Sequence, residues 1–404
     1  MNQLTEKRQI NGMRFLFMLT YMVSYLTRIN YGAVIVEISD DMGIAASLLS
    51  LAVTGSFITY GAGQLVSGYL GDRIQPKRLV SVGLTITIAM NMLVPFCNNS
   101  WLMTALWCVN GFAQSFMWPP IVRLMVALFK EEDYKKATVV VSWGGSFGTI
   151  FVYLASPVWI MLSGWRLVFW VSAVFGVIMQ LCWNRYCPDI QAEAAAKTEK
   201  AAEAEGGTAF LKSPLIWGIM FAIVLQGALR DGVTTWMPSY ISDTFRFSNA
   251  ASILTGVLLP LFSILSFQVT SKIYNKKPNA PLLCAGSIFL TGGGSALLLL
   301  LFSGKQAVIC IFCMALLTAC MHGVNLILVC MLPVFFKDSG NVSTVSGTLN
   351  ACTYVGSAVS TYGIAKISES AGWNTTIMVW MIIALAGMCI CFSCIPPWKK
   401  RFGK

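Results

Sequence analysis

Charged residues are scarce in this chain. Only 11% of its 404 residues are Asp, Glu, Lys or Arg, whereas soluble domains carry about 25%. Hydrophobic residues make up 56% of the chain, and histidine occurs once. This composition excludes a soluble globular protein, and no nucleophile–base pair or metal-binding cluster stands out. We therefore expect an integral membrane protein that is not an enzyme and holds no metal or cofactor.

Apolar runs long enough to cross a bilayer, about 20 residues each, recur along the whole chain. The first run is a full span without a small-residue cleavage site, so it does not indicate a signal peptide. The predicted fold class is an all-α integral membrane protein with twelve transmembrane helices. They are expected near residues 13–36, 46–70, 78–97, 100–129, 137–162, 166–183, 214–240, 249–270, 280–302, 306–333, 343–365 and 372–395.

The net charge of +11 does not indicate a nucleic-acid partner, because the basic residues follow the positive-inside rule. With the N-terminus in the cytoplasm, most Lys and Arg residues fall in cytoplasmic segments. The expected outer loops hold only Arg166, Arg246, Lys305 and Lys366. We therefore expect a multi-pass protein of the plasma (inner) membrane, surrounded by lipid, with both termini cytoplasmic.

One long polar segment, residues 184–213, interrupts the apolar pattern and is predicted to be a cytoplasmic linker. It divides the chain into an N-terminal six-helix half, residues 1–183, and a C-terminal six-helix half, residues 214–404. Two halves of six helices are typical of transporters built from repeats, which hold their substrate near the membrane midplane. Such a unit is complete in one chain, so we expect a monomer.

The two halves also correspond in detail. Arg28 and Arg230 lie at similar depths in the first span of each half, and the fifth spans are rich in small residues (143–149 and 346–360). Small residues let helix backbones approach closely. In a pseudo-symmetric fold the two arginines are expected to face each other.

The loop after the second span reads GYLGDRIQPKR, residues 68–78. Its Gly68, Asp72, Arg73, Lys77 and Arg78 match the pattern of the major facilitator superfamily in this loop. The resemblance implies the major facilitator fold. We interpret the motif as a charge pair of Asp72 and Arg73 at a helix end that grips a neighbouring helix on the cytoplasmic side.

An arginine at membrane depth costs several kcal/mol unless it is paired. Asp231 is the one carboxylate plainly at depth, but it adjoins Arg230, so the two side chains are expected to project about 100° apart. The missing counter-charge is then most simply an anionic ligand, since guanidinium groups bind phosphate or carboxylate with two hydrogen bonds. The alternative is that each arginine is structural and is satisfied by backbone carbonyl oxygens or by Asp231.

Several segments resemble the organophosphate:phosphate antiporter family, which includes glycerol-3-phosphate and hexose-6-phosphate transporters. In that family the arginines at the places of Arg28 and Arg230 bind the phosphate of the substrate. The resemblance implies an antiporter that exchanges an organophosphate for inorganic phosphate by alternating access. The segments that carry it are residues 25–32, 60–79, 117–125, 229–241, 343–357 and 371–379.

The chain also departs from that family. Ile29 and Thr235 replace a lysine and an aspartate, and Gln64 and Phe147 stand where the family has a lysine and a histidine. The candidate site thus keeps two arginines but has fewer cationic neighbours. Transport of an organic carboxylate, such as a sugar acid, is therefore an alternative. A sugar-phosphate sensor that does not transport is another.

Helical spacing adds further candidates for the site. Tyr25 lies three residues before Arg28, and Gln226 lies four before Arg230, so each shares a face with its arginine. Trp118, Tyr354 and other membrane aromatics such as Tyr31 are candidates for stacking walls. The single histidine, His322, is a candidate for proton coupling, although a structural hydrogen bond is the simpler reading.

Overall fold

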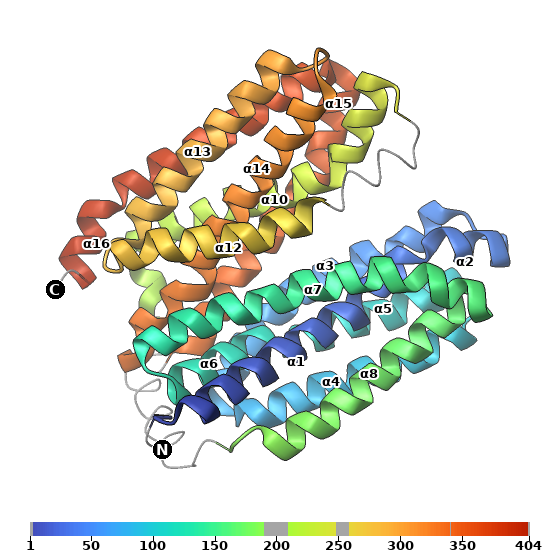
Figure 1. Ribbon diagram of the computed structural model, residues 1–404, viewed down its shortest axis with the longest axis horizontal. Coiled ribbons are helices and arrows are strands. Elements are labelled where there is room, and N and C mark those ends of the chain that lie inside the picture. Colours follow the sequence, from blue (N-terminus) through green and yellow to red (C-terminus); the bar gives the residue numbers. More distant parts are fainter. Residues whose placement is uncertain (1–2, 190–208, 248–257, 340, 403–404) are drawn as a thin grey trace. The chain divides into compact units, whose positions relative to one another are not determined.

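The computed structural model describes residues 3–189, 209–247, 258–339 and 341–402. Within these ranges the chain forms helices and turns without a β-strand (Figure 1). The all-α architecture expected from the apolar runs is thus confirmed. The described residues belong to two compact units. One comprises Met1–Gly207 with Phe336–Ala351, and the other comprises Thr208–Phe335 with Cys352–Lys404.

The first unit is a bundle in which α1 packs against α7 and α8, α3 packs against α5, and α4 packs against α5 and α8. It also includes the beginning of α15 (Val342–Ser393). Most of the predicted linker 184–213 (residues 190–208) lies outside the described residues. The elements of this unit are α1 (Lys7–Ala33), α2 (Ile35–Met42), α3 (Ala46–Arg73), α4 (Pro76–Leu93), η1 (Val94–Phe96), α5 (Ser100–Gln114), α6 (Trp118–Leu128), α7 (Glu131–Ser163) and α8 (Trp165–Tyr186).

In the second unit α14 packs against α10, α12 and α13. The predicted span 249–270 is described only from residue 258 onward. The elements are η2 (Ala209–Lys212), α10 (Pro214–Phe245), α12 (Leu258–Lys276), α13 (Pro281–Phe302), α14 (Ala307–Asn325), η3 (Leu326–Met331), η4 (Leu332–Ser339), α15 (Val342–Ser393) and α16 (Ile395–Phe402). Both η4 and α15 cross the boundary between the units.

Proline and glycine decide where several helices break. The predicted span 100–129 is two helices, because Pro119 and Pro120 lie in the first turn of α6, where a missing backbone N–H is tolerated. The last two predicted spans are two helices that follow one another within α15 and are separated at Gly372, where the backbone is not helical. This glycine has a φ of 75°, a left-handed conformation that glycine adopts without steric cost.

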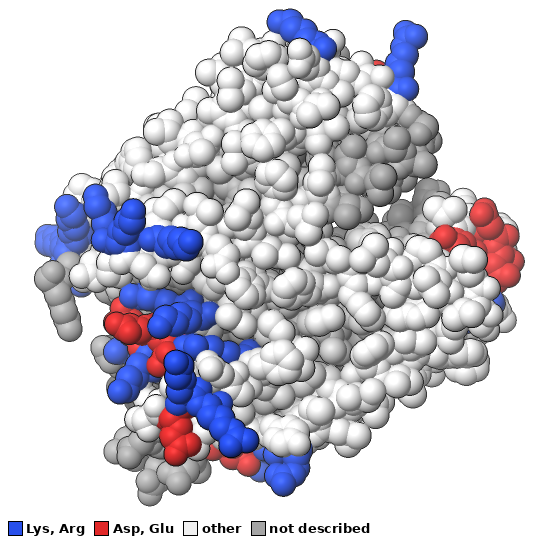
Figure 2. Space-filling view, viewed as in Figure 1, with Lys and Arg blue, Asp and Glu red and all other residues white. Residues whose placement is uncertain are grey.

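The surface has the character of a membrane protein. Eight helices within the described residues are long and apolar enough to cross a bilayer. Large apolar side chains are exposed on them, such as Met161 at 88% and Leu162 at 72%. On the face shown in Figure 2, charged side chains gather at the ends of the helices and leave the middle uncharged. The protein is therefore a multi-pass integral membrane protein.

Glycines on α7 bring α1 close to it. A β-carbon at Gly144 would lie 2.4 Å from the carbonyl oxygen of Met18, and one at Gly148 would lie 2.6 Å from that of Met22. Any larger residue would push the two helices apart. A β-carbon at Gly148 would also lie 2.9 Å from the β-carbon of Tyr25. The small residues of the fifth span thus fix the position of a predicted site residue on α1.

Candidate functional site

In the first unit, Arg28 lies on α1 with 8% of its surface exposed. Its guanidinium carbon lies 4.3 Å from the ring centroid of Tyr25 and 4.6 Å from that of Tyr60. Contacts of a cation with an aromatic face contribute roughly 0.5–2 kcal/mol each. Tyr25 was expected from helical spacing, whereas Tyr60 was not. The signal for Tyr60 was its position one helical turn before Gln64 on α3.

Aromatic rings continue from this arginine toward α6. The ring of Tyr25 lies 5.1 Å from that of Tyr21, which in turn lies 5.1 Å from Trp118. Trp118 is buried, and its indole N–H has no hydrogen-bond partner. The structure thus brings the predicted residues Tyr25 and Trp118 into one aromatic row that ends at Arg28.

Gln64 lies on α3, one turn after Tyr60. Its side chain is fully buried, and neither the oxygen nor the nitrogen of its amide has a hydrogen-bond partner. A buried polar group in this state costs about 1–3 kcal/mol. A carboxamide can donate to an anionic oxygen and accept from a hydroxyl. Gln64 therefore has the chemistry of a ligand-binding residue.

A buried polar network holds the backbone beside Arg28. The carbonyl oxygen of Thr27 accepts hydrogen bonds from the side-chain amides of Asn91 (3.0 Å) and Asn110 (3.1 Å). The amide of Asn30 donates to Asn91 over 2.8 Å. All four polar side chains are fully buried, so the network ties α1 to α4 and α5 next to the arginine. Sequence reasoning missed it, although Asn residues inside apolar runs were a visible signal.

In the second unit, Arg230 forms a two-point ion pair with its neighbour Asp231 on α10. The distances are 2.6 Å from Nε to Oδ1 and 2.8 Å from the terminal nitrogen to Oδ2. Ser357 on α15 also donates a hydrogen bond to Oδ2 of Asp231. The expectation that these adjacent residues could not share one direction is wrong. The long arginine side chain bends along the helix surface and meets the short carboxylate.

Gln226, which helical spacing places on the face of Arg230, forms a hydrogen bond to another helix. Its amide nitrogen donates to the carbonyl oxygen of Met321 over 3.1 Å, and the side chain is fully buried. It therefore links α10 to α14 one turn before Arg230. The next residue on α14, His322, packs edge-on against Phe267 with ring centroids 5.7 Å apart. It lies within Coulombic range of Arg230.

The remaining predicted aromatics have mixed surroundings. Phe147 on α7 is 39% exposed, and Tyr354 on α15 is half-buried. Tyr31 is fully buried in an apolar cluster, where its ring lies 5.0 Å from that of Trp107 and 5.9 Å from that of Phe169. Its role is packing, and it is not a wall of the candidate site.

The motif residue Asp72 caps a helix that follows it by about 270 residues. Its carboxylate accepts hydrogen bonds from the backbone N–H groups of Ser343 (2.9 Å) and Thr344 (2.7 Å). Both belong to the first turn of α15, where unpaired N–H groups and the helix dipole favour a negative charge. A β-carbon at Gly68 would lie 2.8 Å from the Ser343 carbonyl oxygen, so this glycine allows the close approach.

The charge pair expected within the motif does not form. Arg73 donates to the carbonyl oxygen of Tyr69 over 3.1 Å and lies 3.6 Å from the centroid of its ring. Each carboxylate oxygen of Asp72 instead accepts a hydrogen bond from a backbone N–H group of α15. Lys77 lies 3.7 Å from a carboxylate oxygen of Asp189.

One more arginine of the motif and one arginine near it have these surroundings. Arg78 is exposed on α4. Arg123, on α6, donates hydrogen bonds to the carbonyl oxygens of Gly71 and Ile74. Arg123 thus ties α6 to the end of α3, on which Asp72 lies.

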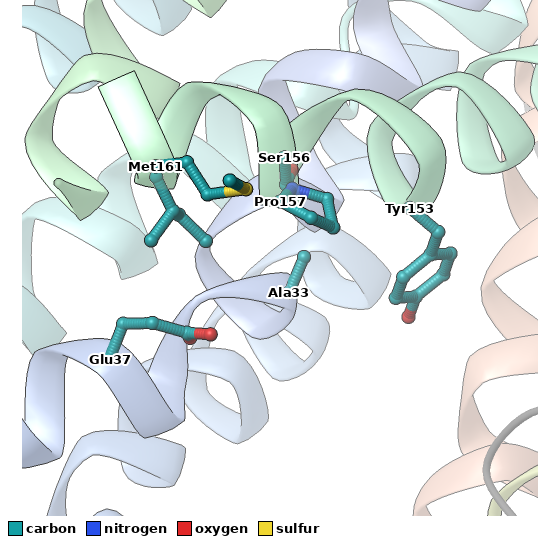
Figure 3. A pocket seen from close by; sticks show the side chains of 7 residues that line it. Ala33, Glu37, Tyr153, Ser156, Pro157 and Met161 are labelled. Atoms are coloured by element: carbon teal, nitrogen blue, oxygen red, sulfur yellow. The ribbon is translucent and has the colours of Figure 1, made fainter. Parts of the chain in front are cut away.

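A separate cavity of about 320 Å³ lies between the end of α1, the start of α2 and α7. Figure 3 shows Glu37 on one side and Ser156, Pro157 and Tyr153 on the other. None of the predicted site residues lines this cavity. Its walls are mainly apolar, and it is not the candidate site for an anion.

Comparison with known proteins gives the following relatives. The chain is 23% identical over 389 residues to the membrane sensor protein UhpC of Salmonella typhimurium, covering 91% of this chain and 87% of UhpC. A "Probable hexose phosphate transport protein" of Chlamydia trachomatis is 23% identical, covering 61% and 59%. The glycerol-3-phosphate transporter of Bacillus subtilis is 25% identical, covering 56% of each chain. These relatives agree with the resemblance to the organophosphate:phosphate antiporter family.

The fold comparison gives the same architecture. The proton:xylose symporter XylE superposes with a TM-score of 0.77 over 99% of this chain and 97% of XylE, at 10% sequence identity. At this identity the likeness supports the fold alone. The sequence model of the Major Facilitator Superfamily matches residues 17–361. The chain therefore belongs to the major facilitator superfamily, a family of membrane transporters and not of enzymes.

Proposed function

We propose that this protein transports an organic anion by alternating access. The transported anion is a sugar phosphate or glycerol phosphate, which is exchanged for inorganic phosphate. Arg28 and Arg230 bind the anionic group. Relatives named as probable hexose phosphate transport proteins and as glycerol-3-phosphate transporters support this substrate class. In this proposal the protein acts as a monomer in the plasma (inner) membrane, with both termini in the cytoplasm.

The observation that carries the proposal is the environment of Arg28. Its guanidinium carbon lies close to the ring centroids of both Tyr25 (4.3 Å) and Tyr60 (4.6 Å), and Gln64, one turn further along α3, has a buried amide without a hydrogen-bond partner. Contact with two rings restricts the motion of the guanidinium, and a planar guanidinium binds a phosphoryl group with two parallel hydrogen bonds.

Other residues complete the proposed sites. Trp118 lies at the far end of the aromatic row that begins at Arg28, and Phe147 adds an apolar surface on α7. In the second unit, Gln226 and Tyr354 are assigned to the surroundings of Arg230. These assignments rest on helical spacing and on the family resemblance, and substitution of each residue tests them.

The experiment that tests the function is uptake into liposomes that contain the purified protein. Labelled glycerol-3-phosphate or glucose-6-phosphate is added outside, with or without inorganic phosphate inside. We expect saturable uptake that requires internal phosphate. Replacing Arg28 by alanine removes charge-assisted hydrogen bonds that together contribute about 2–4 kcal/mol. Affinity should then fall by about 30-fold or more.

The matched control is Arg8→Ala, because Arg8 is an exposed arginine on the same helix α1 and lies outside the motif and the candidate site. It should leave uptake unchanged. Equal uptake by Arg28→Ala and the wild type would remove Arg28 from the site. Uptake of gluconate or glucuronate without uptake of any phosphate ester would instead establish the carboxylate alternative.

Sensing is a second candidate function. It is favoured by the relatives named UhpC, a membrane sensor protein, which match 91% of this chain. In this case the protein should bind a sugar phosphate, seen as a rise in its unfolding temperature, but should not carry it into liposomes. Uptake and thermal stabilisation measured on the same preparation therefore separate the two functions.

A further inference from the structure

The carboxylate of Asp231 holds Arg230 in the way that a bound anion would. Both of its oxygens accept from the guanidinium, at 2.6 Å and 2.8 Å, which is the paired geometry of an arginine with a carboxylate or phosphate ligand. This ion pair is largely buried, since the side chain of Arg230 is 15% exposed and that of Asp231 is 31% exposed. No other ion pair described here joins adjacent residues.

A second helix keeps the carboxylate in this position. The hydroxyl of Ser357 on α15 lies within hydrogen-bond distance of Oδ2 of Asp231 and of the carbonyl oxygen of Thr353 (2.9 Å), and its single proton is shared between these two acceptors. The two helices meet closely, because a β-carbon at Gly227 would lie 2.1 Å from the Thr353 carbonyl oxygen. The packing of α10 against α15 therefore places Ser357 where it orients the carboxylate toward the arginine.

We propose that Asp231 is a specificity-determining residue that occupies Arg230 in place of the transported anion and makes the site favour singly charged anions. This inference rests on the proposed function, in which Arg230 binds the anionic group. An arriving anion must either displace the carboxylate or bind beside it. Coulomb repulsion from the carboxylate grows in proportion to the charge of the ligand, so a dianion is disfavoured more than a monoanion.

The test compares two ligands that differ in charge and share one skeleton. Glycerol-3-phosphate is a dianion at mildly alkaline pH, and its methyl phosphodiester is a monoanion. Affinity is measured as stabilisation of the purified protein against unfolding. Asp231→Asn keeps the size of the side chain and removes its charge. We expect this variant to bind the dianion at least tenfold more tightly than the wild type, with a smaller gain for the monoanion.

Two further variants test whether the effect comes from the charge of Asp231 at this position. Asp243→Asn removes an exposed carboxylate from the same helix α10 and should leave the ratio of the two affinities unchanged. Ser357→Ala keeps the charge of Asp231 but removes the hydroxyl that orients it. It should shift the ratio in the same direction as Asp231→Asn by a smaller factor, and it decides the question if Asp231→Asn does not fold.

The possible failures can be told apart. If the wild type binds these anions and Asp231→Asn leaves the affinity ratio unchanged or weakens binding, Asp231 does not set the charge preference. If a folded Ser357→Ala is the only variant available, an unchanged ratio has the same meaning. If the wild type and the folded variants all bind neither ligand, the proposed function itself fails, and the inference falls with it.

Discussion

Replacing Asp72 by alanine removes both side-chain acceptors from the first turn of α15. In the structure its carboxylate accepts from the N–H groups of Ser343 at 2.9 Å and Thr344 at 2.7 Å, and the side chain is 1% exposed. Hydrogen bonds to a charged group contribute about 1.5–3 kcal/mol each. Water can hydrate part of this turn once the carboxylate is gone. We therefore expect the free energy required to unfold the first turn of α15 locally to fall by about 2–4 kcal/mol.

Hydrogen–deuterium exchange with mass spectrometry measures this opening directly. A loss of about 2–4 kcal/mol corresponds to exchange that is roughly 30-fold to 700-fold faster. The increase should be confined to peptides that cover Ser343 and Thr344. Asp72→Asn retains one oxygen acceptor and no charge, so it should give an intermediate increase. Asp243→Asn, an exposed carboxylate on α10, serves as the control.

The reasoning has a clear refutation. If Asp72→Ala folds and these two amides exchange at the wild-type rate, the carboxylate does not cap α15. An equal increase throughout the protein would show a loss of global stability and not of a helix cap.

Two further predictions concern packing and pH. Gly148→Ala should lower the unfolding temperature, because the new β-carbon would lie 2.6 Å from a carbonyl oxygen of α1 and overpacking costs about 1–3 kcal/mol. Gly12→Ala on α1 meets no atom within 4 Å and should leave it unchanged or raise it. Hydrogen bonds from Trp165 and Arg166 lower the pKa of Asp41. The ionised carboxylate therefore stabilises the folded state fully at pH values above the ordinary pKa of a carboxyl group. The difference in unfolding temperature between wild type and Asp41→Asn should therefore shrink as the pH falls through the lowered pKa, and a gap that persists in acid would contradict this.

Much of the fold follows from the sequence because each membrane helix satisfies its own backbone hydrogen bonds. The apolar runs therefore predicted a helical membrane protein. Local spacing along one helix was equally informative, since it placed Tyr25 on the face of Arg28. The glycines of the fifth span likewise indicated close helix packing, and they do bring α7 against α1.

Contacts between distant segments were outside the reach of sequence reasoning. The carboxylate of Asp72 caps a helix about 270 residues away, and Tyr60 reaches Arg28 from another helix. Neither distance along the chain nor periodicity encodes such a meeting, because it depends on how the helices pack.

The pair of Arg230 and Asp231 shows that even a contact between adjacent residues could not be predicted from the sequence. The sequence determined that a cation and an anion are neighbours at membrane depth, and ideal helical projection placed them apart. The tertiary structure decided that they join, because Ser357 on α15 holds the carboxylate and the flexible arginine side chain folds onto it. Side-chain direction in a packed bundle is set by the neighbouring helices, and these are known only once the chain has folded.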